Sequence, residues 1–311
     1  MSNKKKMNQG VIKKNKSNVP FYKRESFVAY LFMAPTIIGF TFLVAYPLLS
    51  SMYYSLCDWD GLTKPTFIGL ENFRFLFFSD PIFWKSIGLT LAFVLMTVPI
   101  SLVLGMALAC LLNKSLPGIR IFRTIYYLPA IVPSVAAMVL WLFIYKSDYG
   151  LFNNILLTMG LPAVGWLTDK KVVLISLSIM KFWAVGGTMI IFLSGLQSVP
   201  ADLYEAADID GATRIKKFFK ITLPLITPIL FLQLITGMIG AFQAFNEAAI
   251  MTKGGPNYGS HFVAYDIYNN AFNYSLFGRS SAEVWVLFAI IMVFTIIVFR
   301  GSEQYVYYEN D

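Results

Sequence analysis

The 311-residue sequence has few charged residues and few of the residues that carry enzyme or metal chemistry. Charged residues make up 14% of the chain, which holds only two cysteines and one histidine. Neither Cys57 nor Cys110 has a second cysteine or a histidine at ligand spacing, so we expect no metal site. His261 stands alone, and we expect it to be a solvated loop residue rather than a functional one.

The common motifs of nucleotide-binding and hydrolytic enzymes are missing as well. No glycine is followed by lysine, which excludes the phosphate-binding loop G-x-x-x-x-G-K-[ST]. Neither H-E-x-x-H nor G-x-S-x-G occurs. We therefore expect a chain that is not an enzyme and holds no cofactor. The energy for any active process must come from another protein.

What the chain has in excess is apolar surface. Hydrophobic residues make up 57% and aromatic residues 16%, with a mean hydropathy of +0.63. Runs of about 20 apolar residues match a hydrocarbon core about 30 Å thick, in which the chain must be helical to satisfy its backbone. Six runs have no charge or, in the fourth, only Lys181: 27–50, 86–112, 124–145, 172–199, 221–246 and 284–299.

These runs predict an all-α integral membrane protein with six transmembrane helices. The last run is short, so we expect its helix to extend back toward Ala282 or Leu276. The alternative, buried helices of a large soluble core, is disfavoured by the presence of six such runs in one chain. The first run is 24 residues long, holds two prolines and lacks a cleavage site. It is expected to remain as a membrane helix rather than to act as a signal peptide.

The distribution of lysine and arginine predicts the orientation. Of the 25 lysines and arginines, sixteen would lie on one side of the membrane. They fall in the first 26 residues, in the loops after the second and fourth spans, and at Arg300. Cationic residues are retained in the cytoplasm, so both termini and residues 200–220 are expected there. A basic tail beside a membrane also explains the net charge of +8 without a nucleic acid. Cys57 and Cys110 then lie on opposite sides and are not expected to pair.

The resulting organisation has five parts. They are a basic, disordered cytoplasmic tail (1–26), the first transmembrane helix (27–50), an extracytoplasmic segment (51–85), a five-helix core with a cytoplasmic elbow at 200–220 (86–300) and a cytoplasmic C-terminal tail (301–311).

The elbow is a charged stretch between two apolar spans, read as "EAADIDGATRIKKFFKITLP" at 205–224. Pro200 suits the first turn of a helix, and Leu203, Ala206 and Ala207 fall on one face of it. Gly211 can adopt the left-handed conformation that ends a helix. A second amphipathic helix then leads to the fifth span, so the sequence predicts a helix–glycine–helix elbow.

Small side chains on the elbow are suited to a close partner. Ala206 and Ala207 leave the backbone bare enough to fit a partner's cleft. Glu205 can hold a donor of that partner or bond to amides of the elbow itself. The alternative is an amphipathic helix lying on lipid headgroups, but three carboxylates would then face an anionic leaflet.

The elbow resembles a family signature. The pattern E-A-A, three residues, G, nine residues, I-x-L-P is that of the inner-membrane subunits of binding-protein-dependent ABC importers. It is complete here, and its residues are Glu205, Ala206, Ala207, Gly211, Ile221, Leu223 and Pro224. "FIGLENFRFLF" (67–77) resembles a segment of the sugar-permease branch. "FNEAAIMTKGGPNYGS" (245–260) is similar to the first permease subunit of the maltose and glycerol-phosphate type, with Asn246 where an aspartate is common.

The resemblance implies an architecture and a set of partners. It implies the type I ABC importer permease fold in the cytoplasmic (inner) membrane, crossing it several times. It also implies a second homologous permease subunit, two ATP-binding subunits that hold ATP and magnesium, an extracytoplasmic solute-binding protein and a sugar substrate. The elbow would be the coupling helix. Its expected coupling residues are Glu205, Ala206, Ala207, Gly211, Leu223 and Pro224.

Polar groups inside the spans suggest where a substrate passes, since such groups usually face the interior. The candidates are Lys181, Trp183, Phe242, Gln243, Asn246 and Glu247. On a continuous helix, Gln243 and Asn246 share a face and could reach one side of a sugar, with Phe242 or Trp183 stacked on its ring. The alternatives are that Lys181 extends to the interface, that Trp183 packs helices and that Gln243 bonds a neighbouring backbone.

Rival functions have less support in the sequence. A secondary carrier or channel without an ATPase partner would need charged relays within its spans, where only Lys181 is available. A membrane transferase could use Asp58 and Asp60, but "CDWDG" fits an interfacial tryptophan with solvated acids better. Which sugar is carried does not follow from the sequence.

Overall fold

The computed structural model describes residues 25–114 and 116–302, which form two units that divide after Ser51. The expected tails, 1–26 and 301–311, lie almost wholly outside these residues. Within the first unit, α1 (Glu25–Phe40), the π-helical turn η2 (Thr41–Ala45) and the start of α2 (Tyr46–Tyr54) follow one another without a break. Their side chains are mainly apolar and exposed. This helical run, Val28–Tyr54, is long and apolar enough to cross a membrane, as expected for the first span.

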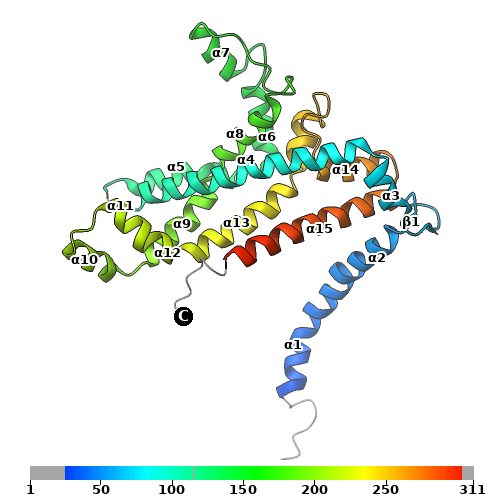
Figure 1. Cartoon of the computed structure of the whole chain (residues 1–311), viewed down its shortest axis with the longest axis horizontal. Coiled ribbons are helices and arrows are strands. Elements are labelled where there is room, and N and C mark those ends of the chain that lie inside the picture. Colours follow the sequence, from blue (N-terminus) through cyan, green and yellow to red (C-terminus); the bar gives the residue numbers. More distant parts are fainter. Residues whose placement is uncertain (1–24, 115, 303–311) are drawn as a thin grey trace, which may run out of the picture. The chain divides into compact units, whose positions relative to one another are not determined.

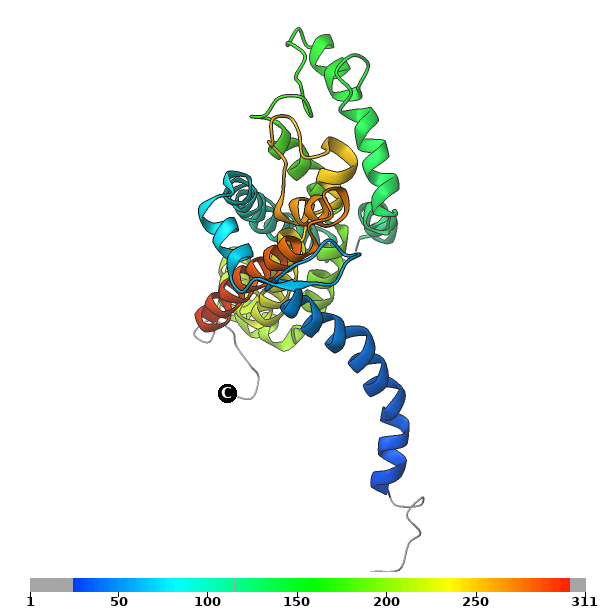
Figure 2. The ribbon, with the colours of Figure 1, turned by 90° about the vertical axis from the view of Figure 1, so that its right-hand side faces the viewer.

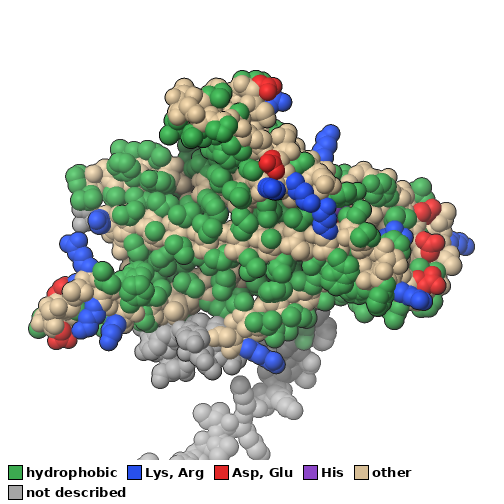
Figure 3. All heavy atoms as spheres, turned by 45° about the horizontal axis from the view of Figure 1, so that its top comes forward, with side chains coloured by type: hydrophobic (Ala, Val, Ile, Leu, Met, Phe, Trp, Pro, Cys, Tyr) green, Lys and Arg blue, Asp and Glu red, His purple; other side chains and the backbone are tan. Residues whose placement is uncertain are grey.

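The second unit is built around three long helices that run side by side (Figure 1). They are α4 (Pro81–Leu112), α13 (Thr227–Phe242) and α15 (Phe277–Ser302). Asp80 begins α4 by accepting hydrogen bonds from the amides of Ile82 and Phe83, with Pro81 in the first turn. Hydrophobic side chains cover much of the surface between the two ends of the molecule, while charged side chains gather over the elbow at one end and again at the opposite end (Figure 3). This is the surface expected of a membrane-spanning bundle.

Two of the six expected spans are divided into two helices that meet at a sharp angle, which the sequence did not predict. The run 124–145 is divided between α5 (Ile119–Ile131) and α6 (Ser134–Ile144), which meet at 96°. The run 172–199 is divided between α8 (Val173–Trp183) and α9 (Gly186–Ser198), which meet at 46°. The described residues therefore hold four helices able to cross a membrane alone, and six spans when each bent pair counts as one. Both Figure 1 and Figure 2 show α7 (Leu151–Thr158), which follows α6, projecting away from the packed helices.

A proline stands at the first break and a glycine at the second. Pro133 has no amide hydrogen to continue α5 and stands as the N-cap of α6. At the second break, Gly186 lies against the backbone of Tyr126 in α5, where a Cβ atom would collide with the Tyr126 carbonyl. Only glycine permits this approach.

The fifth span is also interrupted, while the sixth follows expectation. After η3 (Phe218–Thr222) and α12 (Leu223–Leu225), α13 ends at Phe242, and the helix resumes as η4 (Glu247–Thr252). The expectation of one continuous helix carrying Gln243 and Asn246 on one face is therefore wrong. By contrast, α15 begins at Phe277, close to the Leu276 limit expected for the last span.

The end of the second unit opposite the elbow is closed by short elements, and we call it the hairpin end. Strands β1 (Cys57–Asp58) and β2 (Thr66–Phe67) pair antiparallel ahead of α3 (Glu71–Phe78). Asn72 holds them by donating to the carbonyls of Ser55 and Cys57 at 3.0 and 2.8 Å. In the turn, hydrogen bonds from the amides of Thr63 and Leu62 and from the Thr63 hydroxyl lower the pKa of Asp60 to about 2.

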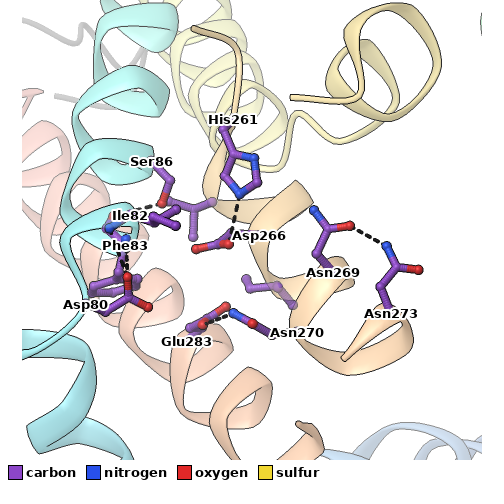
Figure 4. A network of polar contacts seen from close by, with 12 residues as sticks. Asp80, Ile82, Phe83, Ser86, His261, Asp266, Asn269, Asn270, Asn273 and Glu283 are labelled. Carbon is purple, nitrogen blue, oxygen red and sulfur yellow. Dashed lines mark hydrogen bonds and ion pairs between the residues drawn. The ribbon is translucent and has the colours of Figure 1, made fainter. Parts of the chain in front are cut away.

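A buried polar network lies at the same end, between α4, α14 (Val263–Tyr268), η5 (Asn269–Asn273) and α15 (Figure 4). The Nε2 atom of His261 lies 2.9 Å from Oδ1 of Asp266, and Asn270 donates to Glu283 at 2.5 Å. His261 is 8% exposed. The expectation of a solvated loop histidine is therefore wrong, because Asp266, five residues along, gives the buried ring a polar partner.

Candidate translocation site and coupling elbow

The interruptions in the third, fourth and fifth spans meet around one cavity of about 240 Å³. Each break contributes lining residues to this cavity. The first break contributes Pro129, Ala130, Val132 and Ser134, the second contributes Lys181, Trp183 and Ala184, and the third contributes Glu247. Backbone freed from helical hydrogen bonds is tolerated at membrane depth only inside protein or beside a polar cavity. Discontinuous helices around such a cavity are also the usual setting of a transported solute.

An ion pair between Lys181 and Glu247 lies at this cavity. Lys181 comes from the last turn of α8 and Glu247 from the first residue of η4. The side chain of Glu247 is 4% exposed, whereas that of Lys181 is 40% exposed. A buried carboxylate needs a partner of opposite charge, so the lysine neutralises it while keeping one side open to the cavity. The pair joins the halves of the fourth and fifth spans that are remote from the elbow.

A second cavity, of about 290 Å³, reaches Lys181 and Ala184 from the side of α4 and α13. Its polar lining groups are Thr97, Ser101, Thr188, Gln233 and Thr236. Sequence reasoning did not select the four hydroxyl side chains. The spacing of the polar lining residues could have indicated this cavity. Thr97 and Ser101 are four residues apart, Gln233 and Thr236 are three apart, and each pair lies on one helical face. That signal is weak, because the hydroxyls of Thr97 and Thr236 also bond carbonyls of their own helices at 2.7 and 2.8 Å.

The six residues expected along the path are not all at these cavities. Lys181, Trp183 and Glu247 meet at the first one, where the Trp183 ring also packs edge to face against Trp141 at 6.0 Å. Phe242 is 2% exposed and packs against Phe294 at 5.4 Å, in a cluster between α13 and α15. Gln243 and Asn246 are exposed, and neither lines the two cavities. Phe242, which is buried against α15, is therefore not available to stack on a sugar held by Gln243 and Asn246.

The elbow has the helix–glycine–helix form predicted from the sequence. Helix α10 (Ala201–Ile209) starts after Pro200, and Gly211 has φ +68°, the left-handed conformation expected of it. Helix α11 (Arg214–Lys217) follows, with the hydroxyl of Thr213 accepting from the amide of Lys216. The second helix is shorter than expected, since the chain passes into the π-helical η3 at Phe218.

Two polar contacts hold the elbow together, and its outer face is uncovered. Lys217 pairs with Asp208 at 2.6 Å, and the hydroxyls of Tyr204 and Thr222 lie 2.8 Å apart. Helix α10 has no buried residue, so Glu205 and Ala206 are exposed, Ala207 is half-buried, and Ile209 is 88% exposed. Leu223 and Pro224, at the junction with the fifth span, are half-buried.

Comparisons with known proteins agree with this geometry. A probable ABC transporter permease protein, YesP, of Bacillus subtilis is 37% identical, over 93% of this chain and 94% of its own. The trehalose/maltose transport system permease protein MalF of Thermococcus litoralis is 32% identical, over 89% of this chain and 94% of its own. A chain in the crystal structure of a bacterial ABC transporter that imports the acidic polysaccharide alginate has the same fold. Its TM-score is 0.80 at 22% identity, over 90% of this chain and 96% of that one. The family model described as "binding-protein-dependent transport system inner membrane component" matches residues 101–306, and the chain belongs to that family.

Proposed function

We propose that this chain is the permease subunit of an ATP-driven importer of sugars or sugar derivatives. The observation that carries the proposal is the elbow. An exposed surface with small and acidic side chains projects from a membrane bundle whose sequence lacks a phosphate-binding loop of its own. Such a surface suits a separate ATP-hydrolysing subunit that pushes on the membrane helices. The sugar class is supported by relatives named for trehalose, maltose and alginate.

The proposed assembly contains this chain, a second homologous permease and two ATP-binding subunits that hold ATP and magnesium. In a second structure of the alginate importer, the transporter is in complex with a periplasmic protein that carries an alginate pentasaccharide. We propose an equivalent extracytoplasmic solute-binding protein here. The chain itself would carry no enzymatic activity, and the exposed apolar surface of α1 and α6 would contact lipid or the second permease.

Within this chain, we propose that the sugar passes the two cavities at Lys181. Hydroxyl and amide groups of Thr97, Ser101, Gln233 and Thr236 offer hydrogen bonds to sugar hydroxyls, and Trp183 offers an apolar face. Because Glu247 neutralises Lys181, the site carries little net charge. This arrangement supports a path at the helix breaks rather than at Gln243 and Asn246.

The elbow would face the cytoplasm and the hairpin end the outside of the cell membrane. A cysteine introduced at Asn257 should react with an impermeant maleimide in intact cells. One at Lys16 or Ser302 should react only after the membrane is opened. Labelling at position 302 from outside would contradict this orientation.

Co-purification tests the proposed coupling. The chain should bring down an ATP-binding subunit when extracted in mild detergent, and Glu205→Lys should weaken that association. Asp58→Lys, which places the same charge at the exposed hairpin end, should leave it intact. Solute uptake that needs neither ATP nor a co-purifying ATPase would instead support the secondary-carrier alternative.

A further inference from the structure

A separate cavity of about 300 Å³ lies on the inner side of the elbow, where α10, α11 and η3 meet the ends of α4 and α9. Its charged lining side chains are both cationic, Arg214 and Lys217. Lys217 is already paired with Asp208, but among the described residues no carboxylate lies within ion-pair distance of Arg214. The cavity therefore has an excess of positive charge, available to an anion.

Neutral polar groups complete the lining. Asn113, the C-cap of α4, presents an amide. The hydroxyls of Tyr204 and Thr222 lie 2.8 Å apart, and the Thr222 hydroxyl also lies 3.5 Å from the Lys217 carbonyl, so these two groups bond within the elbow. The guanidinium of Arg214, the ammonium of Lys217 and the amide of Asn113 surround one space, and such a donor set suits a phosphate group with its several oxygens.

The remaining lining is apolar and lies at the end of a membrane span. Leu196 and Phe218 belong to the hydrophobic cluster that fixes the elbow to α4 and α9. Helix α4 ends at Leu112, next to the cavity, which is the level at which lipid headgroups would meet a membrane-spanning bundle. Basic cavities between membrane helices at this level are suited to anionic headgroups.

We propose that this cavity binds a phosphate-bearing anion, with the phosphate against Arg214 and supported by Lys217 and Asn113. The anion would come from a phospholipid headgroup or from a soluble phosphate ester. Because the cavity is bounded by both the elbow and α4, the bound group would hold the elbow in the position seen here. The binding does not depend on the proposed transport function, so it can be tested alone.

Native mass spectrometry of the purified full-length chain in neutral detergent measures the binding directly. The probes are short-chain phosphatidylglycerol, short-chain phosphatidylcholine and glycerol 3-phosphate. Arg214→Gln should weaken phosphatidylglycerol binding about fivefold, the contribution of one cationic residue near an anionic surface. Lys216→Gln removes the same charge from the same helix but does not line the cavity, and its effect should stay within about twofold.

The probes separate the two sources of phosphate. If only phosphatidylglycerol binds, and its binding depends on Arg214, the cavity is a lipid site. If glycerol 3-phosphate also binds, and Arg214→Gln weakens its binding equally, the ligand is a soluble phosphate ester. Asn113→Asp keeps the side-chain size and adds a negative charge, so it should weaken either ligand by at least as much as Arg214→Gln. Unchanged thermal unfolding of each variant excludes a folding defect. Equal losses in Arg214→Gln and Lys216→Gln, or no loss in either, would overturn the proposal.

Discussion

The elbow and the centre of the bundle are both places where helices are interrupted, but their side chains have opposite surroundings. At the elbow, Gly211 turns the chain in open space, and Glu205 and Ile209 are exposed. At the centre, Glu247 is 4% exposed and is neutralised by Lys181. An exposed break with apolar and acidic side chains leaves a surface that a partner could cover, while the buried break has its charges balanced within the chain. The first therefore suits the proposed coupling and the second suits the proposed path.

The largest expected effect comes from replacing the glycine that turns the chain at the elbow. Gly211→Val forces a β-branched residue into φ +68°, at a local cost of about 1–3 kcal/mol, and should redirect α11 while the chain still inserts. Sugar uptake should fall to background, measured in vesicles with equal amounts of assembled complex. Gly160→Val is the matched control, because Gly160 has φ +73° and equally open space beyond α7. Equal loss in both variants would remove the special role of the elbow.

At the buried break, the two halves of the ion pair should behave unequally. Lys181→Met leaves the Glu247 carboxylate buried without its partner and should lower the free energy of unfolding by about 3 kcal/mol. Glu247→Gln leaves a lysine that can reach solvent and should cost about 1 kcal/mol or less. The double change Lys181→Met with Glu247→Leu should recover most of the loss. Thermal unfolding in detergent measures all three, with exposed Lys171→Met as the control within about 0.5 kcal/mol.

Two glutamines on the fifth span distinguish the cavity lining from the exposed surface. Gln233 lines the second cavity, and Gln243 lies beyond the end of α13. Gln233→Leu should lower uptake about fivefold, the value of one neutral hydrogen bond, while Gln243→Leu should change it less than about twofold. Initial uptake rates with matched expression measure both. A larger effect at Gln243 would return the path to the face expected from the sequence.

The smallest effect belongs to the turn at the hairpin end. Because the folded pKa of Asp60 is lowered to about 2, its carboxylate stabilises the turn above the unfolded pKa of about 3.9. That stabilisation is lost as the pH falls from about 4 through about 2. Asp60→Asn should raise hydrogen exchange at the amides of Leu62 and Thr63 at pH 7. Asp58→Asn, at an exposed position in the strand, should not. Identical exchange in the two variants would mean that Asp60 does not cap the turn.

The sequence predicts the elbow well because the elbow is made of local chemistry. Pro200, Gly211 and the following basic residues act on their own neighbours, and no distant contact is needed to form the turn. The positions of the spans can likewise be predicted, because each apolar run is a property of its own stretch of sequence. The sixth span is located correctly even though its apolar run is short.

The centre of the bundle depends on contacts between distant segments, so it was predicted less well. Prolines and glycines are tolerated inside membrane helices, so Pro133 and Gly186 did not show that the helix would break there. Lys181 and Glu247 were both selected as candidates, but their pairing needs the fourth and fifth spans to be placed side by side. The burial of His261 likewise depends on how the loop folds against α14.

Reconstitution of the complete importer in proteoliposomes tests the central claim most directly. Labelled sugar should accumulate only when ATP is present on the elbow side and the solute-binding protein on the hairpin side. With Gly211→Val in the same complex, the ATP-binding subunits should still hydrolyse ATP while accumulation stops. Sugar accumulation at the wild-type rate in that variant, or in the absence of ATP, would contradict coupling through the elbow.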